Sequence, residues 1–429
     1  MPPTMLSART LARDLPACIG QQVFLQGWVH HTRHLRAVDF LLLRDRTGIT
    51  QVIVELPEQR ALLATLPHEA VVGVTGTAIA SAQAVNGVEV HDPVISPISV
   101  PDAEPPLELF RPSLDVQLPT RLDHAAVSLR HPQSTAVQRL MAAAMRGFRT
   151  TLDSYGCTEI QTPKLLETAP EGGANVFRVD YFGRNAFLAQ SPQLYKQVMV
   201  GALERVYEVA PVFRAEPHDT SRHVSQYLSL DAEFGFIEDH QDVMRILRNC
   251  IAGMLAEMAA VEAPEVTIPA VPAEIPQIHF RDALAMLGAP EDEPDLAPEH
   301  ERALGEWAMR EYGSHWLFVT GYPMSKRPFY THPQPDDDRW SNSFDLLCMG
   351  LEITTGGQRL HQYADYQAAI AARGMDPEPF AGYLEAFKTG MPPHGGFAIG
   401  LERMVKQIVG AANVREVMLF PRDMNRLAP

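Results

Sequence analysis

The sequence predicts an α+β protein in which a small β-barrel precedes a larger domain built on an antiparallel sheet. Short segments rich in β-branched residues alternate with turn residues over residues 21–100, and an acidic, proline-rich stretch follows at 101–112. Beyond it, helix-like and strand-like segments alternate to the end of the chain. A chain of 429 residues is also longer than one core usually serves, which favours two or more domains.

Five strand-like segments and one helix-like segment make up the N-terminal region. Gly, Asp-Arg-Thr-Gly and Asn-Gly turns separate the strands, which we expect at 22–29, 39–45, 50–56, 69–80 and 88–100, with the helix at 57–66. This composition fits an OB-type barrel, a fold that commonly binds single-stranded nucleic acid. Because prolines interrupt strands and helices, we expect the barrel domain at 1–104, a linker at 105–130 and a second domain at 131–429.

The second domain opens with apolar residues at helical spacing over 131–156, followed by a strand-like segment that runs into Pro163. Further strands are expected at 205–216, 225–236, 343–356 and 394–401, with helices between them. The acidic stretch 286–311 is expected to form a solvated helical insertion.

The formal net charge of −16 argues against wholesale coating of nucleic acid but does not exclude a local basic groove. No lysine precedes Lys164, and one basic cluster lies near the N-terminus. Its members are His30, His31, Arg33, His34, Arg36, Arg44 and Arg46. The cluster is a candidate RNA face, and the alternative is a solvated loop whose charges serve solubility.

The four cysteines lie far apart and form no C-x-x-C pair, so neither a zinc site nor a disulfide framework is indicated. No run of about 18 apolar residues is present. We expect a cytoplasmic protein.

One segment of the second domain carries groups suited to a nucleotide. Arg214 and Glu216 lie on a strand-like segment, and a polar loop with Arg222 and His223 leads into a second strand that bears Tyr227. A guanidinium pairs with phosphate, a carboxylate accepts from an adenine amino group, and an aromatic ring stacks on the base. Alone, the segment is equally a β-hairpin with surface ion pairs.

Two further segments accompany it. Near the C-terminus, a glycine-rich strand containing Gly400 leads into an apolar helix that begins near Arg403, where glycine allows close backbone approach to a ligand. Earlier, residues 148–165 have a helix-strand-proline form. In order and separation, the three segments resemble motifs 1, 2 and 3 of class II aminoacyl-tRNA synthetases, and the barrel resembles the anticodon domain of subclass IIb. The resemblance covers nearly the whole chain.

The resemblance implies an N-terminal OB-fold barrel, a class II antiparallel sheet flanked by helices, a homodimer, and the use of ATP and Mg²⁺. Arg214, Glu352 and Arg403 are the expected catalytic residues. The residues expected to bind ATP are Arg214, Glu216, Arg222, His223, Tyr227, Glu352, Gly400 and Arg403. Glu352 and Thr355 match positions that hold magnesium, which requires hard oxygen ligands, and Asp345 is a second carboxylate nearby.

The amino acid is chosen among Asp, Asn and Lys in this subclass. Lys196 and Arg359 match cations that meet a side-chain carboxylate, which favours aspartate. Asp231 matches an aspartate that orients this pocket, where asparaginyl enzymes carry Glu. The residues expected to bind aspartate are Glu171, Gln193, Lys196, Arg214, Asp231, Thr355 and Arg359.

In the barrel, Phe40 and Gln51 match positions that stack on and hydrogen-bond the central anticodon base. His30 stands where discriminating archaeal-type enzymes typically have Trp, and the segment Ser81–Val85 lacks the Lys of their corresponding loop. These differences imply relaxed reading of the last anticodon base, so the expected substrates are tRNA(Asp) and tRNA(Asn). His30, Arg33, Phe40, Gln51 and Val85 are the expected tRNA contacts. Aspartyl-tRNA(Asn) would then be passed to a separate tRNA-dependent amidotransferase.

The spacing of the segments bears on the subgroup. Only about 170 residues separate Asp231 from Arg403, which fits the compact archaeal-like form rather than the bacterial one with a large extra domain. The rivals are an enzyme specific for tRNA(Asp), an asparaginyl enzyme, and a catalytically inactive paralogue that binds RNA. A small-molecule ligase on the same catalytic fold would lack the barrel.

Overall fold

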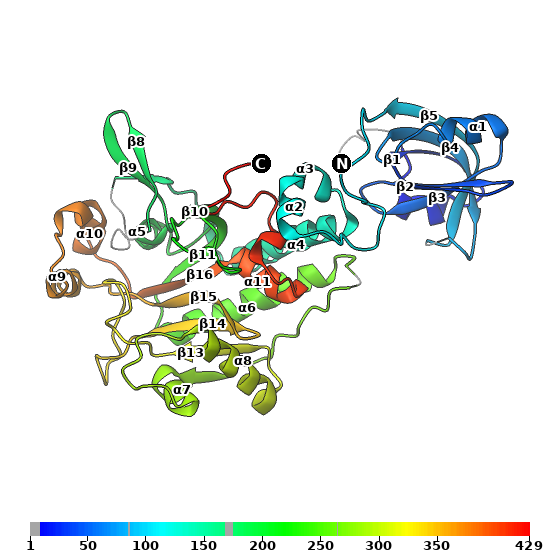
Figure 1. The fold of residues 1–429 in the computed structure, drawn as a ribbon. Coiled ribbons are helices and arrows are strands. Elements are labelled where there is room, and N and C mark those ends of the chain that lie inside the picture. The colour runs from blue at the N-terminus through cyan, green and yellow to red at the C-terminus, as the bar shows by residue number, and fades with distance from the viewer. Residues whose placement is uncertain (1–8, 85, 168–174, 264) are drawn as a thin grey trace. The chain divides into compact units, whose positions relative to one another are not determined.

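The computed structural model describes residues 9–84, 86–167, 175–263 and 265–429. The chain divides into two compact units, Met1–His131 and Pro132–Pro429 (Figure 1). Among the described residues, no helix combines the length and the apolar character needed to cross a membrane.

The first unit contains a closed barrel, whose described strands follow the order β1-β2-β3-β5-β4. The elements are β1 (Gln22–His34), β2 (Asp39–Arg44), β3 (Ile49–Val54), α1 (Pro57–Leu63), β4 (Val71–Ala80) and β5 (Val88–Ser99). Alternate residues such as Leu41 and Leu43 point into the barrel core, as the period of two requires. The predicted barrel is confirmed. Outside it lie η1 (Ala12–Cys18), α2 (Leu118–Asp123) and α3 (Ala125–Ser128).

The second unit is built on a sheet whose described strands have the order β12-β13-β14-β15-β16-β11-β10-β6. They are β6 (Thr158–Glu159), β10 (Arg205–Phe213), β11 (Gln226–Gly235), β12 (Gln277–His279), β13 (Trp316–Thr320), β14 (Ser343–Cys348), β15 (Leu351–Gln358) and β16 (His394–Gly400). The inner pairs are antiparallel, whereas β10–β6 and β12–β13 are parallel. A separate small sheet joins β7 (Leu165–Leu166), β9 (Arg184–Leu188) and β8 (Arg178–Tyr181).

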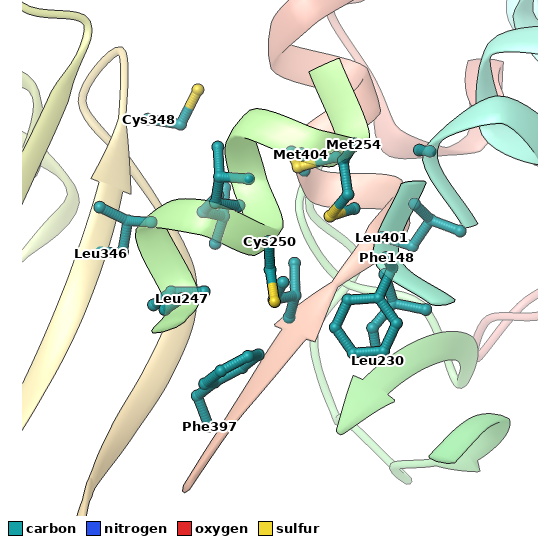
Figure 2. Close-up of a cluster of buried hydrophobic side chains, with 14 of the residues drawn as sticks. Phe148, Leu230, Leu247, Cys250, Met254, Leu346, Cys348, Phe397, Leu401 and Met404 are labelled. Atoms are coloured by element: carbon teal, nitrogen blue, oxygen red, sulfur yellow. The ribbon is translucent and has the colours of Figure 1, made fainter. Parts of the chain in front are cut away.

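Helices flank the large sheet, as predicted (Figure 1). They are α4 (Pro132–Ser154), α5 (Gln193–Leu203), α6 (His240–Ala259), α7 (Phe280–Leu287), α8 (Pro298–Tyr312), α9 (Tyr363–Ala372), α10 (Ala381–Lys388) and α11 (Leu401–Val409), with 3₁₀ turns η2 (Glu378–Phe380) and η3 (Val414–Val417). Helices α4, α6 and α11 bury their apolar faces against the sheet in one core, part of which Figure 2 shows around Cys250 and Phe397. Gly147 lets α4 approach α6 closely, because a Cβ atom there would lie 2.4 Å from the carbonyl oxygen of Gly253.

The acidic stretch 286–311 departs from its predicted character. It does contain helix α8, but one face of this helix packs on the sheet through Glu301, Leu304 and Ala308. A Cβ atom at Gly305 would lie 2.5 Å from the backbone nitrogen of Gly350, so the helix touches the turn between β14 and β15. The prediction of a solvated insertion is therefore wrong for this face, because a sparse apolar pattern among many acids hid its buried side.

Candidate active site

A cleft with a volume of about 140 Å³ lies in the second unit, between the β10–β11 loop, strand β15 and the β16–α11 junction. Its walls combine three segments that are far apart in the sequence. All eight residues expected to bind ATP line it: Arg214, Glu216, Arg222, His223, Tyr227, Glu352, Gly400 and Arg403. Thr355 lines it as well.

One part of the cleft is formed where β10 ends and β11 begins. Pairing of Val212 with Tyr227 brings the ends of these strands together, and the Arg214 guanidinium carbon lies 5.8 Å from the centre of the Tyr227 ring. The expectation that Arg214 and Glu216 lie within the strand is wrong, since β10 ends at Phe213. Both side chains nevertheless line the cleft, from the loop that follows.

The loop between these strands carries two further cleft residues. The side chain of Arg222 is 21% exposed and pairs with the buried carboxylate of Glu301 at 2.6 Å. Burial and the nearby Arg403 guanidinium lower the pKa of His223. Both effects favour the neutral imidazole, which can donate or accept a hydrogen bond.

The β16–α11 junction supplies Gly400 and Arg403 to the opposite wall. Helix α11 begins directly after Gly400, as the sequence predicts. Glu402 points away from solvent, is 4% exposed, and accepts the backbone N–H of Leu228 at 2.9 and 3.1 Å. Burial raises the pKa of Glu402 to about 7. This carboxyl fastens α11 to β11, and sequence reasoning did not assign it a role.

Glu352 and Thr355 lie together on β15 at the edge of the cleft. The Thr355 hydroxyl donates to Glu352 Oε1 at 3.1 Å. Asp345 lies on the neighbouring strand β14 and pairs with Arg327 at 2.9 Å. Burial raises the pKa of Asp345 to about 7, although the positive charge of Arg327 acts to lower it. Within the described ranges no group of three or more His, Cys, Asp or Glu residues forms a metal cluster. The donor set fits magnesium, which binds through one or two carboxylates together with substrate phosphates and water.

A buried cluster of charged side chains, the proposed aspartate pocket, contains several of the residues expected to bind aspartate. Lys196, from α5, is 1% exposed, and its Nζ donates to Asp231 Oδ1 at 3.0 Å. Arg359 approaches from the end of β15 and donates through Nε to Glu233 Oε1 at 3.0 Å. Gln193, at the start of α5, is also buried. Lys196, Asp231 and Arg359 thus come together through contacts with one another and with Glu233, as the resemblance implies, whereas Gln193 lies one helical turn before Lys196.

Glu233 is the residue of this pocket that sequence reasoning missed. It lies between the two cations, 3.4 Å from Lys196 Nζ, and is fully buried. Burial alone would raise the pKa of Glu233, but Arg359 and Lys196 reverse this effect and hold it below its ordinary value. A Cβ atom at Gly396 would lie 2.1 Å from its Oε2, so glycine is required opposite it. The available signal was the period of two on β11, which puts Glu233 on the same face as Asp231.

A hydrogen-bonded layer supports this pocket from behind. Gln197 Oε1 accepts from the hydroxyls of Tyr366 at 3.0 Å and Tyr383 at 2.6 Å. His394 Nε2 lies 3.3 Å from the same Gln197 oxygen, and burial lowers the pKa of His394 to about 4. His394 is then neutral. The formal charges that remain, two positive on Lys196 and Arg359 and two negative on Asp231 and Glu233, sum to zero.

In the barrel, Arg33, Phe40 and Gln51 lie on its outer side. Arg33 pairs with Phe40 across β1 and β2, and Leu42 pairs with Gln51 across β2 and β3. Phe40 is half-buried and does not belong to the barrel core, so the alternative that it is a core residue is wrong. Gln51 donates to Glu89 at 3.0 Å.

Other predicted residues differ in placement. The His30 side chain is only 5% exposed and accepts from Arg44 Nη1 at 3.0 Å, so it is not part of an exposed RNA face. A β-bulge turns it inward, which strand alternation could not predict. Glu171 and Val85 lie outside the described residues.

Comparison with known proteins agrees with this architecture. Residues 117–424 match the family model described as tRNA synthetases class II (D, K and N), and residues 23–98 match the OB-fold nucleic acid binding domain. The aspartate–tRNA(Asp/Asn) ligase of Thermus thermophilus is 48% identical, over 98% of this chain and 100% of its own length. The aspartate–tRNA(Asp) ligase of Thermococcus kodakarensis is 39% identical, over 96% and 97%. The crystal structure of asparaginyl-tRNA synthetase from Pyrococcus horikoshii with asparaginyl-adenylate has a TM-score of 0.90 at 28% identity, covering 99% of this chain and 100% of that one.

The barrel, the sheet and the cleft define an aminoacyl-tRNA ligase with a separate nucleic-acid-binding domain. The chain belongs to the D, K and N family of class II tRNA synthetases, whose members use ATP.

Proposed function

We propose that this chain activates L-aspartate with ATP and transfers the aspartyl group to both tRNA(Asp) and tRNA(Asn). In the first step an α-carboxylate oxygen attacks the α-phosphorus of ATP and pyrophosphate leaves. In the second, the terminal ribose hydroxyl of the tRNA attacks the carbonyl carbon of the adenylate, and AMP leaves. The single observation that carries the proposal is that the cleft adjoins a buried cluster of charged side chains with two cations, Lys196 and Arg359. Asp231, the partner of Lys196, pairs across the sheet with Ala398, which lines the cleft.

In the cleft, the proposed work is positioning and charge neutralisation rather than acid–base chemistry. Arg214 would bind the α-phosphate and the substrate α-carboxylate, and Arg403 a second phosphate. Tyr227 and Glu216 would hold the adenine. Glu352 and Thr355 would hold Mg²⁺, which supplies charge neutralisation for the phosphates when bound.

In the buried pocket, Lys196 and Arg359 would receive the β-carboxylate of aspartate. A carboxylate can accept hydrogen bonds from both cations through both of its oxygens, whereas a carboxamide would turn an N–H group toward one of them, which disfavours asparagine. Asp231 would orient Lys196 and meet the substrate ammonium, and we assign the same ammonium to Glu171. Gln193 would complete the contacts from the start of α5.

The tRNA partners rest on the barrel and on the named relatives. Arg33, Phe40 and Gln51 offer a cation, a ring and an amide on one outer face, a combination that suits unpaired bases. The Thermus thermophilus relative, 48% identical, is named for both tRNAs. We also propose a homodimer, a cytoplasmic location and a functional link to an amidotransferase that acts on aspartyl-tRNA(Asn). All four cysteines lie in the described part of the chain and form no disulfide there. Free thiols are the state that a reducing compartment such as the cytoplasm maintains.

The decisive experiment is aminoacylation of purified tRNA(Asp) and tRNA(Asn) transcripts with labelled aspartate and, separately, labelled asparagine. Charging of both tRNAs with aspartate is the expected result. Charging of tRNA(Asp) alone would establish the second candidate, an enzyme specific for tRNA(Asp). The relative from Thermococcus kodakarensis, which is named for tRNA(Asp) only, supports this candidate. Charging with asparagine would refute the assignment of the buried pocket.

A further inference from the structure

Helix α8 places a buried carboxylate, Glu301, directly behind two residues that line the cleft, Arg222 and Glu352. Glu301 is 5% exposed and comes from none of the segments that resemble the synthetase motifs. Arg222 Nη2 donates to both of its oxygens, at 2.8 and 2.6 Å. The backbone N–H of Glu352 donates to Glu301 Oε2 at 2.8 Å. One carboxylate therefore joins a cleft arginine to the strand that carries Glu352.

The fold places Glu301 rigidly. Gly305 and Gly350 bring the backbone of α8 against the turn between β14 and β15, and a Cβ atom at Gly350 would lie 2.9 Å from Arg302 Cα and 3.1 Å from Glu301 O. Because Gly350 has a φ of +72°, only glycine adopts this turn readily. The N–H of Glu352, two residues later, is thereby presented to the Glu301 carboxylate.

Arg222, in contrast, lies in the loop between β10 and β11, which has no regular secondary structure. A long arginine side chain on such a loop has many rotamers, and an ion pair to a rigid helix restricts them. Glu301 engages only Nη2, so Nε and Nη1 are the donors that it leaves for a phosphate. Burial raises the pKa of Glu301, while Arg222 and the Glu352 N–H oppose the shift. Arg222 thereby favours the ionised form of Glu301 against the effect of burial.

We infer that Glu301 is a positioning residue that holds the Arg222 guanidinium in the cleft for the outer phosphates of ATP. The inference rests on the proposed function of the cleft. Glu301 acts through Arg222 and does not touch the reacting atoms.

The test is ATP–pyrophosphate exchange by the full-length chain, with ATP and aspartate varied separately. Glu301→Gln keeps the shape of the side chain but removes its charge, and we expect the KM for ATP to rise by up to roughly 10- to 150-fold, the range for one lost charge-assisted hydrogen bond. The KM for aspartate should stay within about twofold, since Glu301 contacts no residue of the buried pocket. Glu306→Gln, an exposed change on the same helix, is the matched control and should change neither constant.

A double-mutant cycle shows whether the effect passes through Arg222. Adding Glu301→Gln to Arg222→Ala should raise the KM for ATP by less than about twofold, because the residue that Glu301 positions is already absent. Glu301→Asp is a second variant that keeps the charge but withdraws the carboxylate, and it should raise the KM for ATP less than Glu301→Gln does.

Three results would overturn the inference. These are an unchanged or lowered KM for ATP in Glu301→Gln, an equal rise in both KM values, and additive effects in the cycle. A lowered value would mean that Glu301 competes with ATP for Arg222. Failure of the unmutated chain to catalyse aspartate-dependent exchange would instead refute the proposed function, and the inference with it.

Discussion

Replacing Lys196 with methionine tests the buried pocket most directly. Methionine approximates the length of the lysine stem but carries no charge and donates no hydrogen bond. In the protein, Lys196 Nζ donates to Asp231 at 3.0 Å and to the carbonyl of Phe397 at 3.0 Å, and lies 3.4 Å from Glu233. The substitution leaves one cation, Arg359, with two buried carboxylates.

Two effects of different size follow. Breaking a buried ion pair by removing one partner costs about 3–5 kcal/mol of folding free energy. Loss of one charge-assisted contact to the β-carboxylate weakens transition-state binding by about 1.5–3 kcal/mol, or roughly 10- to 150-fold in kcat/KM for aspartate. Without Lys196, Asp231 and Glu233 outnumber the single cation Arg359, and this excess negative charge also weakens binding of the β-carboxylate. The KM for ATP should change little, because Lys196 does not line the cleft.

The assay is ATP–pyrophosphate exchange with aspartate and asparagine as competing substrates, performed well below the unfolding temperature of the variant. The preference for aspartate over asparagine should narrow by the same factor. Lys388→Met, which removes an exposed lysine on α10, is the matched control. A variant that unfolds more easily yet keeps kcat/KM for aspartate within about threefold would show that Lys196 is structural only, and would refute the reasoning.

Three further predictions concern the cleft and the barrel. Arg214→Ala should abolish aspartate-dependent ATP–pyrophosphate exchange without a large loss of stability, and near-normal exchange would contradict its assigned role. Glu402→Gln should remove a pH dependence of the free energy of unfolding. The pKa of Glu402 is about 7 in the folded protein and 4.5 ordinarily, so folding favours the protonated carboxyl. As pH rises from 4.5 to 7, the free energy of unfolding of the wild type should therefore fall by on the order of 3 kcal/mol relative to the variant. Urea unfolding of both proteins at the two ends of this range measures the difference, and parallel curves would show that the carboxyl titrates normally. Phe40→Ala should raise the KM for tRNA by roughly 5- to 150-fold, the effect of about 1–3 kcal/mol for one stacked base, and leave exchange unchanged; equal charging by variant and wild type would remove Phe40 from the RNA face.

The sequence predicted the parts of the site that follow from local pattern. The barrel strands alternate with a period of two, and the strand–loop–strand and strand–helix segments carry Arg214 and Arg403 at their ends. The antiparallel sheet brings these segments together, but the Arg214 segment alone was also compatible with a surface hairpin, so joining it with Glu352 in one cleft relied on the resemblance to a family. Lys196 and Arg359 came from the resemblance to a family, since nothing local distinguishes them from surface cations.

The carboxylates that hold the cations were harder to predict, for a physical reason. Glu233 and Glu301 are each buried through tertiary contacts with residues far along the chain, Arg359 and Arg222. In sequence, an isolated glutamate on a strand or in an acidic helix has the pattern of a solvated side chain. Only the packed structure shows which glutamates lose water, and therefore which ones need a cation.

Position 30 shows how such burial bears on the choice of tRNA. The β1–β2 register passes from Val29 opposite Leu43 to His31 opposite Leu42, so His30 is the extra residue of a bulge and turns inward. Burial and Arg44 lower the pKa of His30 to about 4, which keeps its ring neutral and able to accept from Arg44. Arg44 also pairs with Glu69 at 2.8 Å.

A tryptophan at this position would be larger and would offer only a donor, so Arg44 would lose an acceptor and would have to be repositioned. The Arg44–Glu69 pair is itself buried, and Arg44 is the last residue of β2, the strand that carries Phe40 on its outer side. Under the proposed function, we therefore expect residue 30 to influence anticodon reading through Arg44 and β2 rather than through contact with a base. A substitution that keeps a buried acceptor for Arg44, such as His30→Gln, should accordingly preserve the ratio of tRNA(Asn) to tRNA(Asp) charging better than His30→Trp does.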